Sequence, residues 1–330
     1  MAPGTLSRAL TQFFPPKPQF TDKDVGDLSG KVYIVTGANT GLGKHVSRIL
    51  YSKNAKVYMT GRSQDKTEAA IKSLQEAAPK STGSLHFLLL DFDDLSTVKA
   101  SAERFLAAEQ RLHVLFSNAG FQGGPGPAVK TAHGYERHLQ VNCLGPLLFF
   151  QLLAPVLTAT AQDPATPPNT VRTVFLSSMA AELFSEKNTG FQMDNLDYHI
   201  EKPNTYRYGI SKLGAWAYAV EGSKKYKDII FIAVNPGNLR TDLFRDQSSI
   251  FRALTNPVNY PPINGAYAEI WAGLSPEVTA DKSGSYAAPF GRIYPIRSDL
   301  EAAAKSEAEG GNASTKKFWD WSEEQISKFA

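Results

Sequence analysis

The residues best suited to chemistry are Tyr208 and Lys212, which lie four positions apart in the stretch Tyr-Gly-Ile-Ser-Lys. On a helix, residues at this spacing project from one face. The ammonium group could then lower the pKa of the phenol and make it a proton donor or acceptor. Such pairs are also common on exposed helices that do no chemistry, so the pair acquires meaning only from the motifs around it.

A glycine-rich turn runs from Thr36 to Gly43. It follows an apolar, β-rich run and opens a stretch with helical spacing, so its glycines would allow a tight turn, close approach of a pyrophosphate and packing of the helix on the strand. The alternative is a glycine-rich loop without a ligand, but the context favours dinucleotide binding. The residues assigned to this site are Gly37, Asn39, Thr40, Gly41, Leu42 and Gly43.

The end of the next expected strand, Met59 to Ser63, bears on which dinucleotide is bound. It carries no carboxylate for a ribose 2′-hydroxyl, and Arg62 offers a planar guanidinium that suits a 2′-phosphate. We therefore predict NADP(H), the alternative being that Arg62 is an ordinary surface residue. Asp91, after the third strand, could accept from the adenine amino group or cap a helix, and Phe92 is assigned to the cofactor site with it.

The elements that must position these residues alternate along the chain. Apolar runs read as strands and amphipathic stretches as helices, which predicts an α/β fold: a single doubly wound, Rossmann-type parallel sheet with helices on both faces. Ligands of such sheets lie outside the carboxyl ends of the strands, where the motifs fall. We expect strands at residues 31–36, 55–60, 85–90, 112–116, 171–176 and 229–234, and helices at 41–52, 64–78, 96–108, 134–158 and 206–225.

Composition narrows the classes of function. The 330 residues are 42% hydrophobic and 20% charged, with a net charge of +3 and no basic run, so nucleic acid is not an expected partner. Cys143 is the lone cysteine and lies in an apolar helical pattern, which fits a buried residue and a cytoplasmic location. The histidines lack the spacing of metal ligands, and we predict no metal site.

The two ends of the chain are expected to flank one domain. Residues 1–30 lack the features of a secretory signal and are predicted to be an arm lying on the domain, with peripheral membrane contact as the alternative. The domain spans 31–298, and 299–330 form a linker and a helix packed on it. The stretch from Leu144 to Leu157 is too short to cross a bilayer, so no integral membrane segment is expected.

Taken in order, the motifs resemble the short-chain dehydrogenase/reductase family. The residues within and beside these motifs are most similar to those of its retinol-dehydrogenase-like and protochlorophyllide-reductase-like branch, including fungal reductases. The matching residues cover positions 36–241. Beyond the glycine-rich turn they are Asp91, Asn118-Ala119-Gly120, Asn142, Ser178, Tyr208, Lys212, Pro236-Gly237, Leu239 and Thr241.

The resemblance implies a role for each catalytic residue. Tyr208 would be the general acid or base, and Lys212 would hydrogen-bond the nicotinamide ribose and lower the pKa of Tyr208. Ser178 would hold the substrate oxygen, and Asn142 would position a water that links Lys212 to solvent. Ser177 competes with Ser178, but adjacent residues of a strand face opposite sides and we choose the second.

The resemblance also assigns residues to the rest of the cofactor. Asn118, Ala119 and Gly120 would border the adenosine ribose. The turn from Pro236 to Leu239, together with Thr241, would fix the carboxamide.

Substrate specificity is expected from an insertion or lid region between Ser178 and Tyr208 and from the segment after residue 241. Phe184, Tyr206 and Phe244 are assigned to an apolar substrate pocket, the alternative being that such residues are simply buried core. The sequence thus predicts an NADP(H)-dependent oxidoreductase acting on a hydrophobic ketone, aldehyde or alcohol, mainly as a reductase. Open alternatives are a non-redox enzyme on the same fold, such as an epimerase, a dehydratase or an enzyme that steers a cyclisation, and a cofactor-sensing regulator.

The oligomeric state is also open. The helices near 134–158 and 206–225 could pair between subunits to form a homodimer, while the C-terminal extension could block this pairing.

Overall fold

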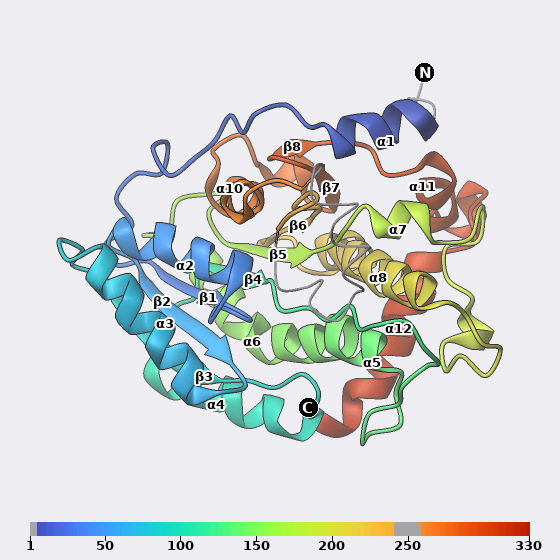
Figure 1. Cartoon of the computed structure of the whole chain (residues 1–330), viewed down its shortest axis with the longest axis horizontal. Helices are drawn as coiled ribbons and strands as arrows, with labels where there is room; N and C mark the ends of the chain where they lie inside the picture. The colour runs from blue at the N-terminus through green and yellow to red at the C-terminus, as the bar shows by residue number, and fades with distance from the viewer. Residues whose placement is uncertain (1–4, 241–258) are drawn as a thin grey trace.

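A mostly parallel sheet forms the centre of the protein (Figure 1). The computed structural model describes residues 5–240 and 259–330. The strand order is β3-β2-β1-β4-β5-β6-β7-β8, in which all pairs are parallel except β7 with β8. The strands are β1 Val32–Val35, β2 Lys56–Gly61, β3 Ser84–Leu89, β4 Val114–Ser117, β5 Arg172–Leu176, β6 Ile230–Val234, β7 Ser285–Ala288 and β8 Arg292–Ile293.

Helices cover both faces of this sheet and bury two apolar cores. One core lies under α4, α6 and α8, and the other under α2, α3 and α10. The central strands are buried along their length, as expected for strands with helices on both sides. The helices are α2 Gly41–Ser52, α3 Gln64–Ala77, α4 Val98–Ala108, α5 Arg137–Leu139, α6 Gly145–Gln162, α7 Ala180–Leu183, α8 Asn204–Lys225 and α10 Pro262–Leu274.

The sequence-based prediction of the fold class is confirmed, and the expected elements match the structure to within a few residues at most ends. The helix predicted at 134–158 is more complex. It consists of α5, one π-helical turn η2 (Gln140–Leu144) and α6. A single π-turn inside an α-helix often marks a functional site.

The stretch Arg137–Gln162 is long and apolar enough to span a membrane by length and composition. However, 72% of its apolar window is buried inside the protein. Leu147, Phe150 and Leu157 are fully enclosed in the core. This stretch is therefore a core helix. The prediction that it is too short to cross a bilayer was wrong about its length, because the helical stretch extends on both sides of residues 144–157.

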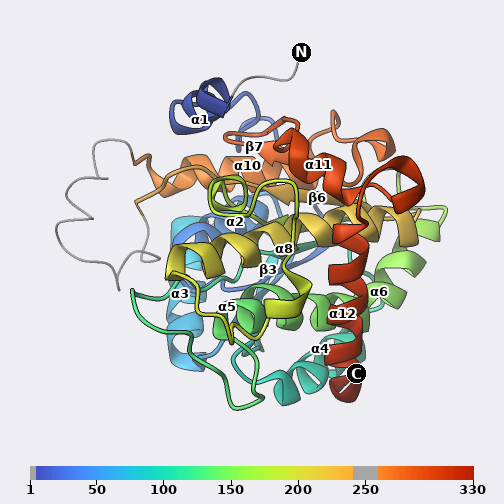
Figure 2. The same ribbon diagram turned by 90° about the vertical axis from the view of Figure 1, so that its right-hand side faces the viewer.

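The C-terminal residues differ in part from the expected linker. Helix α11 (Ser298–Ala304) begins where a linker was predicted, and the short turn η7 (Glu307–Glu309) follows it. The prediction undervalued the run of alanines, which favours a helix. Helix α12 (Ser314–Ile326) then packs against α8 and α6 (Figure 2). The ring of Phe318 is fully buried there, stacked on Phe191 at 4.1 Å.

The N-terminal residues form helix α1 (Thr5–Phe13), which lies near α7 and β8 (Figure 1). The prolines of this region do not interrupt the helix, because Pro15 and Pro16 come after its last residue.

Candidate active site

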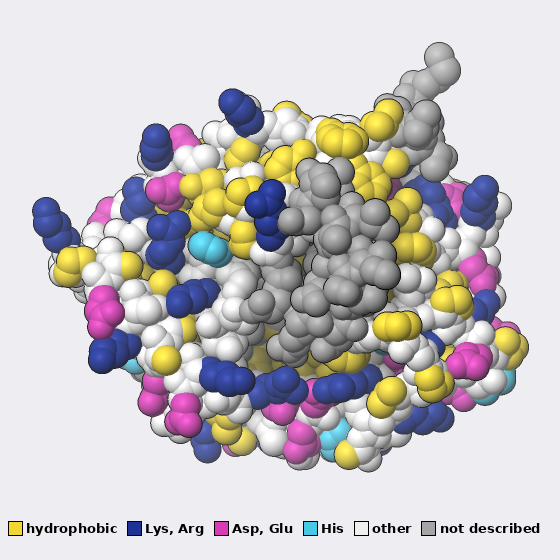
Figure 3. Space-filling model, in the orientation of Figure 1, with side chains coloured by type: hydrophobic (Ala, Val, Ile, Leu, Met, Phe, Trp, Pro, Cys, Tyr) yellow, Lys and Arg dark blue, Asp and Glu magenta, His cyan; other side chains and the backbone are white. Residues whose placement is uncertain are grey.

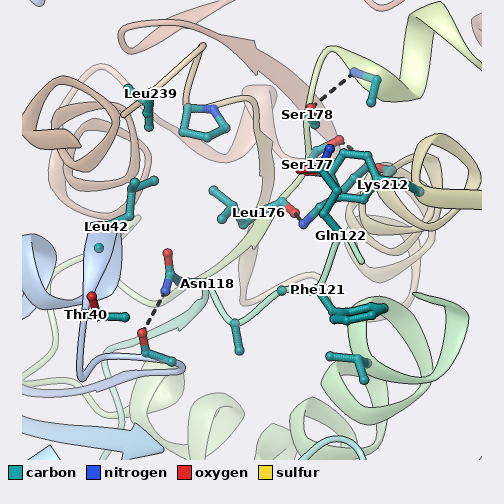
Figure 4. Close-up of a pocket in the computed structure, with 18 of the residues that line it drawn as sticks. Thr40, Leu42, Asn118, Phe121, Gln122, Leu176, Ser177, Ser178, Lys212 and Leu239 are labelled. Carbon is teal, nitrogen blue, oxygen red and sulfur yellow. Dashed lines mark hydrogen bonds between the residues drawn. The ribbon is translucent and has the colours of Figure 1, made fainter. Parts of the chain in front are cut away.

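A cavity of about 680 Å³ opens at the carboxyl ends of the parallel strands, where α/β sheets of this kind bind their ligands (Figure 4). Most of the predicted site residues line it together. Those at its wall are Gly37, Asn39, Thr40, Gly41, Leu42, Arg62, Phe92, Asn118, Ala119, Gly120, Ser178, Phe184, Tyr208, Lys212, Pro236, Gly237 and Leu239.

The glycine-rich turn is held against the end of β4 by a set of hydrogen bonds. Asn118 Nδ2 donates to the carbonyl of Thr36 at 2.7 Å, and the amide of Ala119 donates to Thr36 Oγ1 at 2.8 Å. Gly43 lies so close to these groups that a Cβ there would meet Asn118 Nδ2 at 2.6 Å. Gly43 does not line the cavity itself, and its role is to let helix α2 approach the sheet.

The same turn has the shape that a dinucleotide requires. Gly41 has a φ of +56° and is the first residue of α2. A Cβ built at Gly41 meets no atom within 4 Å, so a side chain there would project into open space. Amide groups at the N-terminus of a helix attract phosphates. These residues therefore fit the pyrophosphate of a dinucleotide.

Arg62 follows β2 at the same end of the cavity and is engaged with an acidic residue. Its Nη1 lies 2.9 Å from Asp93 Oδ2, and Asp93 is also bound by Arg137 at 2.7 Å. These two arginines hold the pKa of Asp93 below its usual value. Lys66, on the first turns of α3, also lines this region and was not identified from the sequence. Arg62 and Lys66 are both cations, as a 2′-phosphate requires.

Tyr208 and Lys212 lie on one face of α8, with the ammonium nitrogen 5.8 Å from the centre of the tyrosine ring. Lys212 Nζ donates to the carbonyl of Leu176 at 2.8 Å, at the end of β5. In Figure 4, Lys212 lies beside Leu176, across the cavity from Thr40. Both side chains are nearly enclosed by the protein.

Burial dominates the ionisation of this pair. It raises the pKa of Tyr208 to about 12, while a hydrogen bond with Ser178 acts in the opposite direction. It lowers the pKa of Lys212 to about 8. Burial therefore acts against the lowering of the Tyr208 pKa that was expected from Lys212, because desolvation penalises the phenolate. Tyr208 keeps its proton at neutral pH, which is the state a proton donor needs.

The two adjacent serines are turned to different partners. Ser177 Oγ donates to the carbonyl of Lys212 at 2.7 Å and is fully buried. Ser178 Oγ accepts from the amide of Ala180 at 3.2 Å and hydrogen-bonds Tyr208. Of the two, Ser178 is therefore the serine whose hydroxyl reaches the tyrosine, and its catalytic role stays a prediction.

Asn142 sits on the π-turn η2 and does not line the cavity. Its Oδ1 accepts from the amide of Phe121 at 2.7 Å, and its Nδ2 donates to Phe121 O and Ser211 Oγ, both at 2.8 Å. A Cβ at Gly120 would lie 3.2 Å from Lys212 Nζ and 3.6 Å from Asn142 Oδ1, so Gly120 separates the two side chains. The side chain of Asn142 fixes the wall of the site beside Lys212.

Besides Gly43 and Asn142, four further assigned residues either do not line the cavity or lie outside the described residues. Tyr206 does not line the cavity. It lies two positions before Tyr208 on α8, a separation that rotates its side chain by about 200° around the helix axis. Its hydroxyl oxygen lies 3.4 Å from Gln192 Oε1. Asp91 is also absent from the wall, and its carboxylate accepts from the amide of Asp93. Thr241 and Phe244 lie outside the described residues.

Several wall residues were missed by the sequence analysis. Most are apolar residues of loops or short helices, where no periodic pattern marks them. They include Phe13, Leu90, Phe121, Val141, Met179, Ala180 and Leu183. Among the described residues that line the cavity there is no Asp or Glu, so its charged side chains are all cationic.

A buried carboxyl group lies on α10, outside the cavity. Glu269 is fully enclosed, and neither of its oxygens has a hydrogen-bond partner in the described part of the chain. Burial raises its pKa to about 8, against an attraction to Lys212 that lowers it. Glu269 is therefore held in its neutral form near pH 7. Over residues 5–240 and 259–330, no three His, Cys, Asp or Glu side chains are placed to share a metal ion.

Comparison of the sequence with known families matches residues 31–188 to the short chain dehydrogenase family. A short-chain dehydrogenase/reductase of Neocamarosporium betae is 48% identical over 98% of this chain and 94% of its own length. Another, from Phomopsis amygdali, is 45% identical over 98% of both chains. The similarity to fungal proteins of this family thus extends over nearly the whole molecule.

Solved structures show the same fold at low sequence identity. An NADPH-bound carbonyl reductase from chicken fatty liver superposes with a TM-score of 0.60 at 19% identity, over 83% of this chain and 97% of that one. A 3-ketoacyl-(acyl-carrier-protein) reductase from Brucella melitensis in complex with NADH gives 0.61 at 20% identity, over 81% and 99%. Proteins of this fold therefore accept either dinucleotide.

Proposed function

The chain belongs to the short-chain dehydrogenase/reductase family, and on this premise we propose that it is an NADP(H)-dependent oxidoreductase. It would transfer a hydride between the nicotinamide and a hydrophobic ketone, aldehyde or alcohol, with reduction as the physiological direction. Membership of the family supports oxidoreductase activity. The choice of cofactor, substrate and direction is our inference from the site.

One observation carries the proposal. The cavity that begins at the glycine-rich turn ends at Ser178, Tyr208 and Lys212, so one continuous space joins a dinucleotide cradle to a proton donor. A binding protein that only senses a cofactor has no use for a buried, protonated tyrosine bonded to a serine.

Three residues of the chain have separate roles in carbonyl reduction. The nicotinamide cofactor, when bound, supplies the hydride. Ser178 donates a hydrogen bond to the substrate oxygen and stabilises the negative charge that develops on it. Tyr208 gives its phenolic proton to that oxygen, which completes the alcohol. Lys212, charged at neutral pH, favours the tyrosinate that is left and so assists the transfer.

The preference for NADP(H) is supported by charge. Arg62, Ser63 and Lys66 lie together beyond the end of β2, and no carboxylate is among the described wall residues there. Asp93 competes for Arg62, so binding of a 2′-phosphate must share or release that ion pair.

The preference for a hydrophobic substrate is supported by the cavity wall opposite the glycine-rich turn. Phe121, Met179, Leu183 and Phe184 border the space near Ser178 and Tyr208. Apolar walls with few polar groups favour apolar ligands oriented by those groups.

We also propose a location in the cell and an oligomeric state. The single cysteine, Cys143, is a free and buried thiol, which suits a reducing compartment such as the cytoplasm. Helix α12 covers parts of α6 and α8, the helices through which a homodimer was considered. We therefore propose that these helices are not an intersubunit surface, and sedimentation velocity would test this by giving the mass of one chain.

The function is tested by following oxidation of NADPH at 340 nm with a panel of aryl ketones and aldehydes of increasing size. We expect turnover of at least one apolar carbonyl compound, faster with NADPH than with NADH. A protein that binds NADPH but oxidises it with none of the panel would contradict the proposal.

A further inference from the structure

Helix α1 reaches the substrate end of the cavity through its last residue. Phe13 is half-buried and lines the cavity, in company with Leu183 and Phe184 of the α7 region and with Asn238. In sequence it stands far from every motif described above. In space it shares the cavity wall with the segment that follows Ser178 and with the turn that follows β6. Helix α1, which carries it, lies near α7 (Figure 1).

The docking of α1 is specific. Gln12 is almost fully buried and bonds to two segments that border the active site. Its Nε2 donates to Glu182 Oε2 at 2.5 Å, on α7, and its Oε1 accepts from Asn235 Nδ2 at 2.8 Å. Asn235 Oδ1 in turn accepts from the amide of Gly237 at 3.0 Å, within the turn assigned to the cofactor. One side chain of α1 thus fixes the position of the helix relative to both walls.

Further contacts hold the same helix. Arg8 is buried and forms an ion pair with Glu182, and it also donates to the carbonyl of Pro295. Arg292, on β8, donates to the carbonyl and the hydroxyl of Thr11, both at 2.8 Å. A buried ion pair of this kind requires good geometry, because both charges have lost their water. The helix is therefore attached through polar side chains other than Phe13.

The neighbouring residue Phe14 provides a contrast. It is 60% exposed, and it does not line the cavity. Hydrophobic side chains gather on the upper part of the face shown in Figure 3. Of the two adjacent aromatic rings, only Phe13 faces the enclosed space.

We propose that Phe13 contacts the substrate and helps to determine its specificity, so that helix α1 forms one wall of the substrate pocket. This inference rests on the proposed function, because it deepens the assignment of an apolar substrate. The class it favours is a flat, apolar aromatic carbonyl compound, since Phe13, Phe121 and Phe184 supply aromatic rings around the space that ends at Ser178 and Tyr208.

The test measures binding, and so it does not depend on turnover. The probe is 2-acetylnaphthalene, titrated calorimetrically into the full-length protein saturated with NADP⁺. The variants are Phe13→Ala, Phe13→Leu and, as the matched control, Phe14→Ala. Circular dichroism and the affinity for NADP⁺ show whether each variant keeps its fold and its cofactor site.

We expect Phe13→Ala to weaken binding of the probe at least about 10-fold, the discrimination that small changes of an apolar pocket produce. Phe13→Leu should fall between that variant and the wild type, and Phe14→Ala should stay within about twofold, as befits an exposed residue outside the cavity. Equal effects of Phe13→Ala and Phe14→Ala, or no binding of the probe to the wild type, would overturn the inference. Binding without turnover in the ketone panel would instead count against the proposed function alone.

Discussion

Replacing Arg62 by alanine is expected to weaken the binding of NADPH and to leave the binding of NADH almost unchanged. Arg62 lines the cavity where a 2′-phosphate would lie, and its side chain is 55% exposed. NADH carries no phosphate at that position, so the substitution should change its affinity little. The comparison of the two cofactors isolates the phosphate contact.

The size of the effect follows from two opposing terms. A hydrogen bond to a charged group contributes about 1.5–3 kcal/mol. Sharing Arg62 with Asp93, 2.9 Å away, offsets part of this, because an exposed ion pair is worth about 0.2–1 kcal/mol. The net loss of roughly 1–2 kcal/mol corresponds to about 5- to 30-fold in the dissociation constant for NADPH.

The assay is fluorescence titration of both cofactors into the wild type, Arg62→Ala and a control, Arg111→Ala. Arg111 is similarly exposed and pairs with Asp163 at 2.7 Å, but it does not line the cavity. A further variant, Asp93→Asn, should tighten the binding of NADPH by releasing Arg62. Equal losses for NADPH and NADH in Arg62→Ala would refute the assignment of a phosphate site.

Two further predictions concern stability. Burial raises the pKa of Glu269 in the folded protein to about 8 from an ordinary 4.5, so the folded state binds more protons than the unfolded state between these values. The free energy of unfolding should therefore fall as pH rises through this window, by up to about 1.4 kcal/mol per pH unit. Urea unfolding at pH 5.5 and 7.5 should show this fall in the wild type but not in Glu269→Gln, and equal falls in both proteins would contradict the prediction. Phe318→Ala should cost about 3–5 kcal/mol of unfolding free energy, because the ring is fully buried against Phe191 and Tyr218. The exposed Lys316→Ala on the same helix should change stability by less than about 0.5 kcal/mol, and similar losses for both would show that α12 is not packed in this way.

Local patterns in the sequence were enough to predict the sheet and its cofactor turn. Strand β6 is a run of five apolar residues, and the turn before α2 carries its glycines at fixed spacing, so both are visible within a short window. The pairing of Tyr208 with Lys212 was predictable for the same reason, since both lie on one helix.

Features that depend on distant contacts were not predictable. Gln12 and Asn235 are joined by a hydrogen bond across most of the chain, and no local pattern records it. The preference of Tyr208 for its protonated form arises from burial by several elements, so its ionisation could not be read from the nearby lysine. Tyr206 was assigned to the pocket, but it lies two residues before Tyr208 on α8, so its side chain points in another direction and its hydroxyl faces Gln192.

The central claim, proton transfer by Tyr208, is tested most directly by Tyr208→Phe. This change removes one hydroxyl group and keeps the ring that fills the site. We predict that the variant binds NADPH as the wild type does, while kcat with the best carbonyl substrate of the panel falls by about 10²- to 10⁴-fold. Retention of wild-type kcat with intact NADPH binding would contradict the account.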